Sequence, residues 1–285
     1  MAAISASQVM ELRAATGAGM MDCKKALEEV GGDMEAAKDH LRKKGIAIAQ
    51  KKSSRETNEG GVGIRVTDDK KHAAIVQLAC ETDFVARNEQ FTGLLDQLAG
   101  QVLAKGDADV PGQPLAEGKG TVSDLLTESI AKVGENLQLL DARRVEIAGE
   151  GTIGGYVHSN GKIGVLVALK SDKAVAGDAL DVLAKDLAMH IAASQVSSVA
   201  GDDIDPAVIA HEKEIFAAQA KESGKPAEIV EKMVQGRVNK FIKEVTLLEQ
   251  PFVKDPERTV KKLLADVGKQ AGATLAVDRF VKLQF

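Results

Sequence analysis

The first 45 residues carry apolar positions at helical spacing, interrupted by glycines at short intervals. Val9 and Leu12 share one face of a first segment, which ends in the Thr-Gly-Ala-Gly stretch at 16–19. Glycine adopts the left-handed conformation that ends helices, so the Gly pair at 31–32 indicates the end of a second helix. The sequence therefore predicts three short helices within residues 5–45: the first up to Thr16, the second at about Met21–Val30, and the third from its cap Asp33 to about Lys44, closed by Gly45.

A change to period two begins near residue 60, after a polar, basic stretch at 50–55 that we interpret as a linker. Residues 62–66 and 74–80 alternate on either side of a polar turn, which is the pattern of a β-hairpin. A helix with apolar positions at 94, 98 and 102 follows, and another is expected at about Val122–Val133, ending at Gly134.

The same design recurs about ninety residues later, which indicates an internal duplication. When Asp83 is aligned with Asp172, Val76 falls on Val165, and the leucines at 94 and 98 fall on those at 183 and 187. The copies differ after the matched strands, where the first has Phe84 and the second has a lysine. A core role would be shared by both copies, so the single aromatic side chain points to a role outside the core.

The remaining segments complete an expected α+β fold: an N-terminal three-helix module, two tandem related α+β subdomains with antiparallel sheets, and an inserted antiparallel helical hairpin. In the hairpin, Pro206 starts one helix, a turn lies at 222–226, and a second helix runs from Ala227 to about Val245. We expect Val208, Ile209, Ile215 and Phe216 to face Ile229, Val230, Met233, Val234 and Val238. The predicted divisions are 1–55 (N-terminal module and linker), 56–140 (first subdomain), 141–205 (second subdomain, first part), 206–248 (helical hairpin) and 249–285 (completion of the second subdomain, with a helix around Val260–Val267).

Composition indicates an ordinary folded protein, since 44% of the 285 residues are hydrophobic and 28% are charged. A net charge of −5 argues against a surface built to neutralise nucleic-acid phosphates. The N-terminus lacks the pattern of an export signal, and the only two cysteines, Cys23 and Cys80, lie far apart. We therefore expect a cytoplasmic protein with buried, structural thiols.

Catalytic motifs are missing from the sequence, which has no P-loop, no GxGxxG after a strand and no HExxH. The five histidines are scattered, and His190 is expected to be a hydrogen-bonded structural residue on a helix. The sequence therefore offers no catalytic residue, metal site or cofactor site, and favours a binding function without covalent chemistry.

Two segments resemble a known family: Thr-Gly-Ala-Gly-Met-Met-Asp-Cys-Lys-Lys-Ala-Leu at 16–27 and Thr-Asp-Phe-Val-Ala-Arg at 82–87. Together they resemble bacterial elongation factor Ts, the guanine-nucleotide exchange factor for elongation factor Tu. Shorter matches at 132–136, 162–167, 190–194, 223–226 and 250–253 extend the resemblance, in order, over essentially the whole chain. It implies a protein of translation elongation that binds elongation factor Tu in its GDP-bound and nucleotide-free forms.

By this resemblance, the first module is a ubiquitin-associated-like domain that docks on the partner GTPase. Leu12, Arg13, Met20 and Met21 match its docking residues. Leu12 has an alternative role in the module's own core. Two adjacent methionines cannot both face inward on a helix, so at least one is expected to be free for the partner.

The resemblance also makes residues 82–85 an intruding loop that disturbs the Mg²⁺ and phosphate site of the GTPase. Phe84 would wedge between partner side chains, while Asp83, flanked by Thr82 and Val85, would reorder contacts around the magnesium ion. The alternative for Asp83 is a helix N-cap, and both roles can coexist. Further positions that match partner contacts are Val133, Gly134 and His158; the hairpin resembles an auxiliary coiled-coil element.

The sequence also bears on two rival functions. An adaptor that binds ubiquitin-like proteins or nascent chains would account for the first module but not for the single-copy Phe84. An RNA-binding translation protein is disfavoured by the acidic balance and by the lack of interleaved basic and aromatic residues. Many members of the resembled family continue past the position that matches Phe285, so a C-terminal contact with the partner is expected to be absent or altered.

Overall fold

The N-terminal module contains three helices in the computed structural model, which describes residues 4–221 and 226–285. They are α1 (Ala6–Thr16), α2 (Met20–Glu29) and α3 (Met34–Lys52). Asp33 caps α3 as predicted, because its carboxylate accepts hydrogen bonds from the N–H groups of residues 35 and 36. The predicted end of this helix at Gly45 is wrong. Gly45 is buried where α3 crosses the later helix α6 (Val122–Val133), and a Cβ there would lie 3.4 Å from the Cβ of Ala131.

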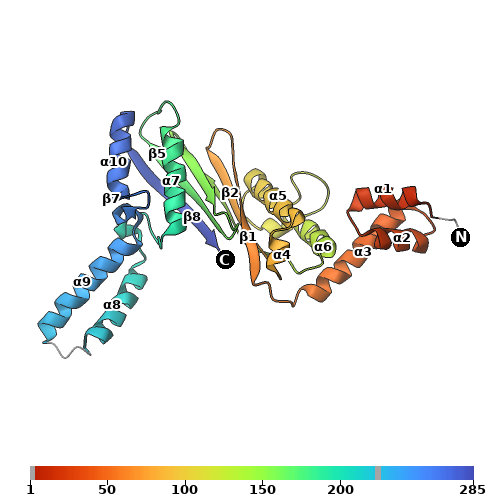
Figure 1. Cartoon of the computed structure of the whole chain (residues 1–285), viewed down its shortest axis with the longest axis horizontal. Helices are drawn as coiled ribbons and strands as arrows, with labels where there is room; N and C mark the ends of the chain where they lie inside the picture. Colours follow the sequence, from red (N-terminus) through yellow and green to blue (C-terminus); the bar gives the residue numbers. More distant parts are fainter. Residues whose placement is uncertain (1–3, 222–225) are drawn as a thin grey trace.

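Gly45 therefore allows two helices to approach closely and does not end one. The basic stretch at 50–55, predicted to be a linker, begins inside α3. Figure 1 shows α3 running from the N-terminal module toward the first sheet.

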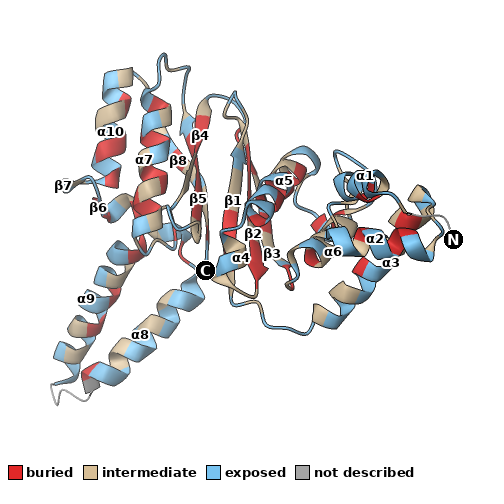
Figure 2. Ribbon diagram, turned by 45° about the vertical axis from the view of Figure 1, so that its right-hand side comes forward, coloured by how far each residue is buried: buried red, intermediate tan, exposed pale blue. Residues whose placement is uncertain are grey.

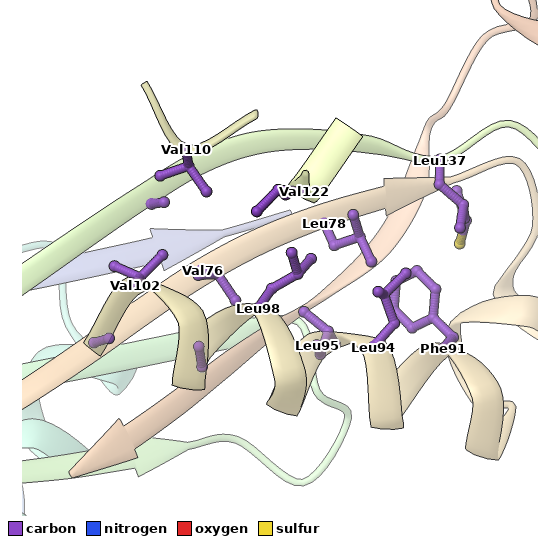
Figure 3. Close-up of a cluster of buried hydrophobic side chains, with 14 of the residues drawn as sticks. Val76, Leu78, Phe91, Leu94, Leu95, Leu98, Val102, Val110, Val122 and Leu137 are labelled. Carbon is purple, nitrogen blue, oxygen red and sulfur yellow. The ribbon is translucent and has the colours of Figure 1, made fainter. Parts of the chain in front are cut away.

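The first α+β unit has a three-stranded antiparallel sheet in the order β1-β2-β3, and the predicted hairpin is confirmed. Helix α5 covers one face of the sheet, and its apolar side chains point at β2 (Figure 3). Helix α6 ends at Gly134 as predicted, in the left-handed conformation with φ of 82°. The elements are β1 (Glu59–Val66), β2 (His72–Cys80), α4 (Asp83–Ala86), α5 (Glu89–Lys105), η1 (Val110–Gly112), α6 (Val122–Val133) and β3 (Gln138–Glu146).

The second unit repeats this plan, with a sheet in the order β4-β5-β8 and β5 at its centre, as β2 is in the first. Helix α7 packs on it through leucines 183 and 187, which the alignment matched to those of α5. The elements are β4 (Gly151–Val157), β5 (Ile163–Ser171), α7 (Ala179–Ala193), η2 (Gly201–Asp203), η3 (Leu247–Glu249), β6 (Pro251–Phe252), β7 (Asp255–Thr259), α10 (Val260–Ala271) and β8 (Leu275–Gln284).

The two sheets pack face to face, so that the sheets lie between the helices of the two units (Figure 1). Alternation along β2 serves both sides, since Ile75 faces the second sheet while Val76 faces α5. The sheets approach closely at Gly164, where a Cβ would lie only 2.4 Å from Cγ1 of Val62. This arrangement buries one shared apolar layer between the duplicated units.

The helical hairpin projects from the second unit (Figures 1 and 2) and consists of α8 (Pro206–Lys221) and α9 (Ala227–Val245). Its own small core contains Ala220, Val234 and Val238, with Ile209, Phe216 and Val230 packed against it. Three residues predicted to face inward, Val208, Ile215 and Ile229, are exposed instead. The turn predicted at 222–226 falls, except for Pro226, outside the described residues.

Val208, Ile215 and Ile229 lie on the outer faces of the hairpin because two helices in contact bury only one narrow stripe each.

Within residues 4–221 and 226–285, none of the helices is long and apolar enough to cross a membrane.

Candidate partner-binding surface

Phe84 lies on the short helix α4, directly after the end of β2. The Thr82 hydroxyl caps this helix by accepting a hydrogen bond from the Val85 N–H at 3.4 Å. The neighbouring side chains of Phe84 and Val85 differ in burial. Val85 packs against the apolar core of the first unit, while Phe84 is 83% exposed. The Phe84 loop (residues 81–87) therefore exposes an aromatic ring to solvent, while the Thr82 cap and the packing of Val85 hold its backbone in place.

This exposure is the largest among the exposed large hydrophobic side chains of the described part of the chain. A single exposed apolar residue is common on protein surfaces and needs no explanation by itself. Here the ring is also the feature that distinguishes the two copies, and the second copy has Lys173 in its place. Exposure and single occurrence together make Phe84 a candidate for contact with another molecule.

Asp83 is not the N-cap of the helix, so that alternative is wrong. Its carboxylate instead makes an ion pair with Arg87 at 3.2 Å, and both side chains are accessible to solvent. An exposed pair of this kind contributes little stability. Asp83 can therefore exchange Arg87 for a partner at small cost.

The turn after α6 is hydrogen-bonded to the first residue of the Phe84 loop. The Asn136 N–H donates to the Glu81 carboxylate at 2.7 Å, and this hydrogen bond, with the nearby Arg55 guanidinium, lowers the pKa of Glu81. Lys52 of α3 donates to the Gly134 carbonyl. Val133 and Gly134, predicted as further contacts, are thereby brought next to the loop.

The turn that contains His158 reaches the same end of the sheets. Lys162 in this turn makes an ion pair with Glu59 at 2.6 Å, and Glu59 lies opposite Cys80 at the start of the Phe84 loop. His158 is exposed, and its Nδ1 lies 3.1 Å from the hydroxyl of Tyr156. The structure thus places the predicted contacts of both α+β units at the same end of the paired sheets.

The predicted docking residues of the N-terminal module divide into two groups. Leu12 is fully buried, so it belongs to the module's own core and is not exposed for docking. Arg13 is exposed, and Met20 and Met21 are 50% and 62% exposed, respectively. Sequence reasoning missed Met10, which is 64% exposed on α1. Exposed methionines adapt well to irregular partner surfaces.

The polar interior agrees with a structural role for His190. This residue is buried, its Nε2 lies 2.9 Å from Oε1 of Gln250, and its Nδ1 accepts from the Val253 N–H at 3.2 Å. Burial lowers its pKa, so the neutral ring is retained. Cys23 and Cys80 are free and buried, as predicted, and burial raises the pKa of Cys80 to about 12. Such a thiol is unreactive at neutral pH.

Within residues 4–221 and 226–285, no group of three or more His, Cys, Asp or Glu side chains is arranged to hold a metal ion. The surface around Phe84 instead combines exposed apolar and charged side chains, which are suited to contact with a protein.

An α+β fold with an exposed aromatic ring on an anchored loop is suited to binding another protein. A family model described as "Elongation factor TS" matches residues 81–285. Relatives named elongation factor Ts include that of Nitratidesulfovibrio vulgaris strain DP4, which is 49% identical over 284 residues, covering 99% of this chain and 96% of the relative. The protein of Hydrogenovibrio crunogenus is 48% identical over 286 residues (99% and 91%), and that of Clostridioides difficile strain 630 is 46% identical over 289 residues (100% and 93%).

The chain belongs to the elongation factor Ts family. Membership identifies it as a factor of translation elongation, and implies that it is a nucleotide exchange factor for elongation factor Tu.

Proposed function

We propose that this protein binds the GDP-bound form of elongation factor Tu and inserts the Phe84 loop beside the nucleotide site of that GTPase. The loop disturbs the Mg²⁺ and phosphate contacts, GDP leaves, and the nucleotide-free GTPase stays bound until GTP enters. The observation that carries this proposal is the anchored, 83% exposed ring of Phe84, which occurs in only one of two duplicated units.

Thermodynamic linkage explains why binding of this protein promotes the release of GDP. A protein that binds the nucleotide-free state more tightly than the GDP state must weaken GDP binding by the same factor. Bound Mg²⁺ neutralises the phosphate charge, so lost Mg²⁺ contacts make the diphosphate easier to release. Exchange therefore needs no covalent step, and the nucleotide concentrations set its direction.

Each part of the chain has a role in this scheme. The N-terminal module (1–55) docks on the GTPase through Arg13, Met20 and Met21. The first subdomain (56–140) intrudes with residues 82–85, and Val133 and Gly134 add contacts beside them. The second subdomain (141–205 and 249–285) grips another part of the partner, with His158 at its edge, and the hairpin (206–248) is auxiliary. The complex acts in the cytoplasm and requires neither nucleic acid nor a cofactor.

Release of labelled GDP from elongation factor Tu tests this function. Adding the protein with excess unlabelled nucleotide should accelerate release by about tenfold or more, as expected for ordinary coupling between two sites. Chelation of Mg²⁺ should accelerate release without the protein and shrink the protein's further effect, because both act on the same contacts. A release rate that does not depend on the protein would contradict the proposal.

A further inference from the structure

Glu135, which follows the last turn of α6, makes three hydrogen bonds to the start of the Phe84 loop. Its Oε1 accepts from the Thr82 hydroxyl at 2.7 Å. Its Oε2 accepts from the Thr82 N–H at 3.0 Å and from the Glu81 N–H at 3.1 Å. One carboxylate thus receives two consecutive backbone donors and the capping hydroxyl of α4. Hydrogen bonds to an ionised acceptor are stronger than neutral ones.

The position of Glu135 is itself fixed from two sides. Gly134 before it ends α6 in the left-handed conformation, and its carbonyl accepts from Lys52. Asn136 after it donates through Nδ2 to the Arg55 carbonyl at 2.9 Å and through its N–H to Glu81. The carboxylate is therefore carried by a turn that is held both to α3 and to the strand end.

The second unit serves as an internal comparison. Helix α10, which precedes β8 as α6 precedes β3, also ends at a left-handed glycine, Gly272, with φ of 64°. The residue after it is Ala273, where the first unit has Glu135. The loop after β5 carries Lys173 instead of an aromatic ring. The carboxylate and the exposed aromatic residue thus occur together in one copy and are both missing from the other.

We propose that Glu135 is a positioning residue that holds the Phe84 loop in the conformation that enters the GTPase. This inference rests on the proposed function. Thr82 is the N-cap of α4, so the orientation of its N–H and hydroxyl groups fixes how α4 leaves the strand and where the Phe84 ring points. Without Glu135, two amides and one hydroxyl lose their acceptor, and the loop spends time in other conformations. In the docked complex, the loop then occupies its competent conformation for a smaller fraction of the time.

Three variants test the proposal. Glu135→Ala removes all three hydrogen bonds, whereas Glu135→Gln keeps one oxygen acceptor and loses the second. Glu128→Ala is the matched control, because this exposed glutamate on the preceding helix α6 pairs only loosely with Lys132 at 3.9 Å. Thermal unfolding of each variant establishes that it is folded. If the alanine variant does not fold, the glutamine variant carries the test.

Hydrogen–deuterium exchange reads the loop directly. In Glu135→Ala, the amides of residues 81 and 82 should exchange about tenfold faster or more, because local opening becomes easier. The maximal rate of GDP release should fall by about tenfold, while the concentration for half-maximal release changes by less than about threefold, since docking elsewhere is unaffected. Glu135→Gln should lie between, and Glu128→Ala should match the unchanged protein. Unchanged amide exchange, or an unchanged maximal rate, would overturn the proposal.

The double variant Glu135→Ala with Phe84→Ala separates positioning from a general structural effect. If Glu135 acts through Phe84, the double variant should release GDP no more slowly than Phe84→Ala alone. Additive losses would overturn the proposal. Its failure is distinct from failure of the proposed function, because the latter appears as a wild-type rate in the single Phe84→Ala variant.

Discussion

Replacing Phe84 with alanine should slow the protein-stimulated release of GDP from elongation factor Tu by about 30-fold or more. An aromatic anchor at the centre of a protein interface contributes about 2–4 kcal/mol, and each 1.4 kcal/mol is a factor of ten in rate. The ring is 83% exposed in the free protein, so its contacts become available to the complex without any cost of unpacking. Stopped-flow release of a fluorescent GDP analogue measures this effect.

The free protein should keep its stability in this variant. Because Phe84 lies outside the apolar core, the free energy of unfolding should change by about 0.5 kcal/mol or less. Leu140→Ala is the control, since this residue of β3 is 51% exposed in the same unit. It should leave the release rate nearly unchanged. A wild-type rate for Phe84→Ala, or a loss of stability typical of a core residue, would contradict the interpretation.

A large effect on folding is expected at Gly154, where β4 meets α7. A Cβ at this position would lie 2.5 Å from the carbonyl carbon of Ala184 and 2.7 Å from the backbone nitrogen of Lys185. The backbone of α7 cannot yield as a flexible side chain would. Gly154→Ala should therefore lower the free energy of unfolding by about 3 kcal/mol or more, the upper range for overpacked cores. Urea denaturation followed by circular dichroism measures it.

Gly236→Ala provides the matched control for that substitution. Gly236 is exposed on α9, and a Cβ there would meet nothing within 4 Å. Alanine in a helix interior is favoured over glycine by about 0.5–1 kcal/mol, so this variant should be equally or more stable. Equal behaviour of the two variants would show that the close approach of β4 and α7 is not what stabilises the second unit.

The sequence allowed much of the fold to be predicted because its signals are local. Period-two alternation marked β1 and β2, Gly134 marked the end of α6, and the duplication placed β5 beside α7. The role of Gly45 could not be predicted, because a glycine that ends a helix and a glycine that permits close packing look the same in the sequence. Only the position of α6 against α3 distinguishes the two.

The candidate site was predicted less completely, for a physical reason. Phe84 could be selected because the duplicated copy lacks an aromatic residue at that position. Leu12 lies at helical spacing with Val9, so it was equally consistent with a core or a surface position, and it proved to be in the core. Glu135 was missed because its partners lie more than fifty residues away in the sequence. The match between Glu135 and Ala273 of the second unit depends on the ends of α6 and α10, which only the structure shows.

Photocrosslinking from position 84 tests the central claim most directly. Benzoylphenylalanine replaces Phe84, the variant is mixed with elongation factor Tu, and the crosslinked peptide is identified by mass spectrometry. The account predicts a crosslink to a segment beside the nucleotide site, with a yield that falls when excess GDP and Mg²⁺ are added. A complex that forms normally but crosslinks elsewhere, or with a yield that does not depend on nucleotide, would contradict it.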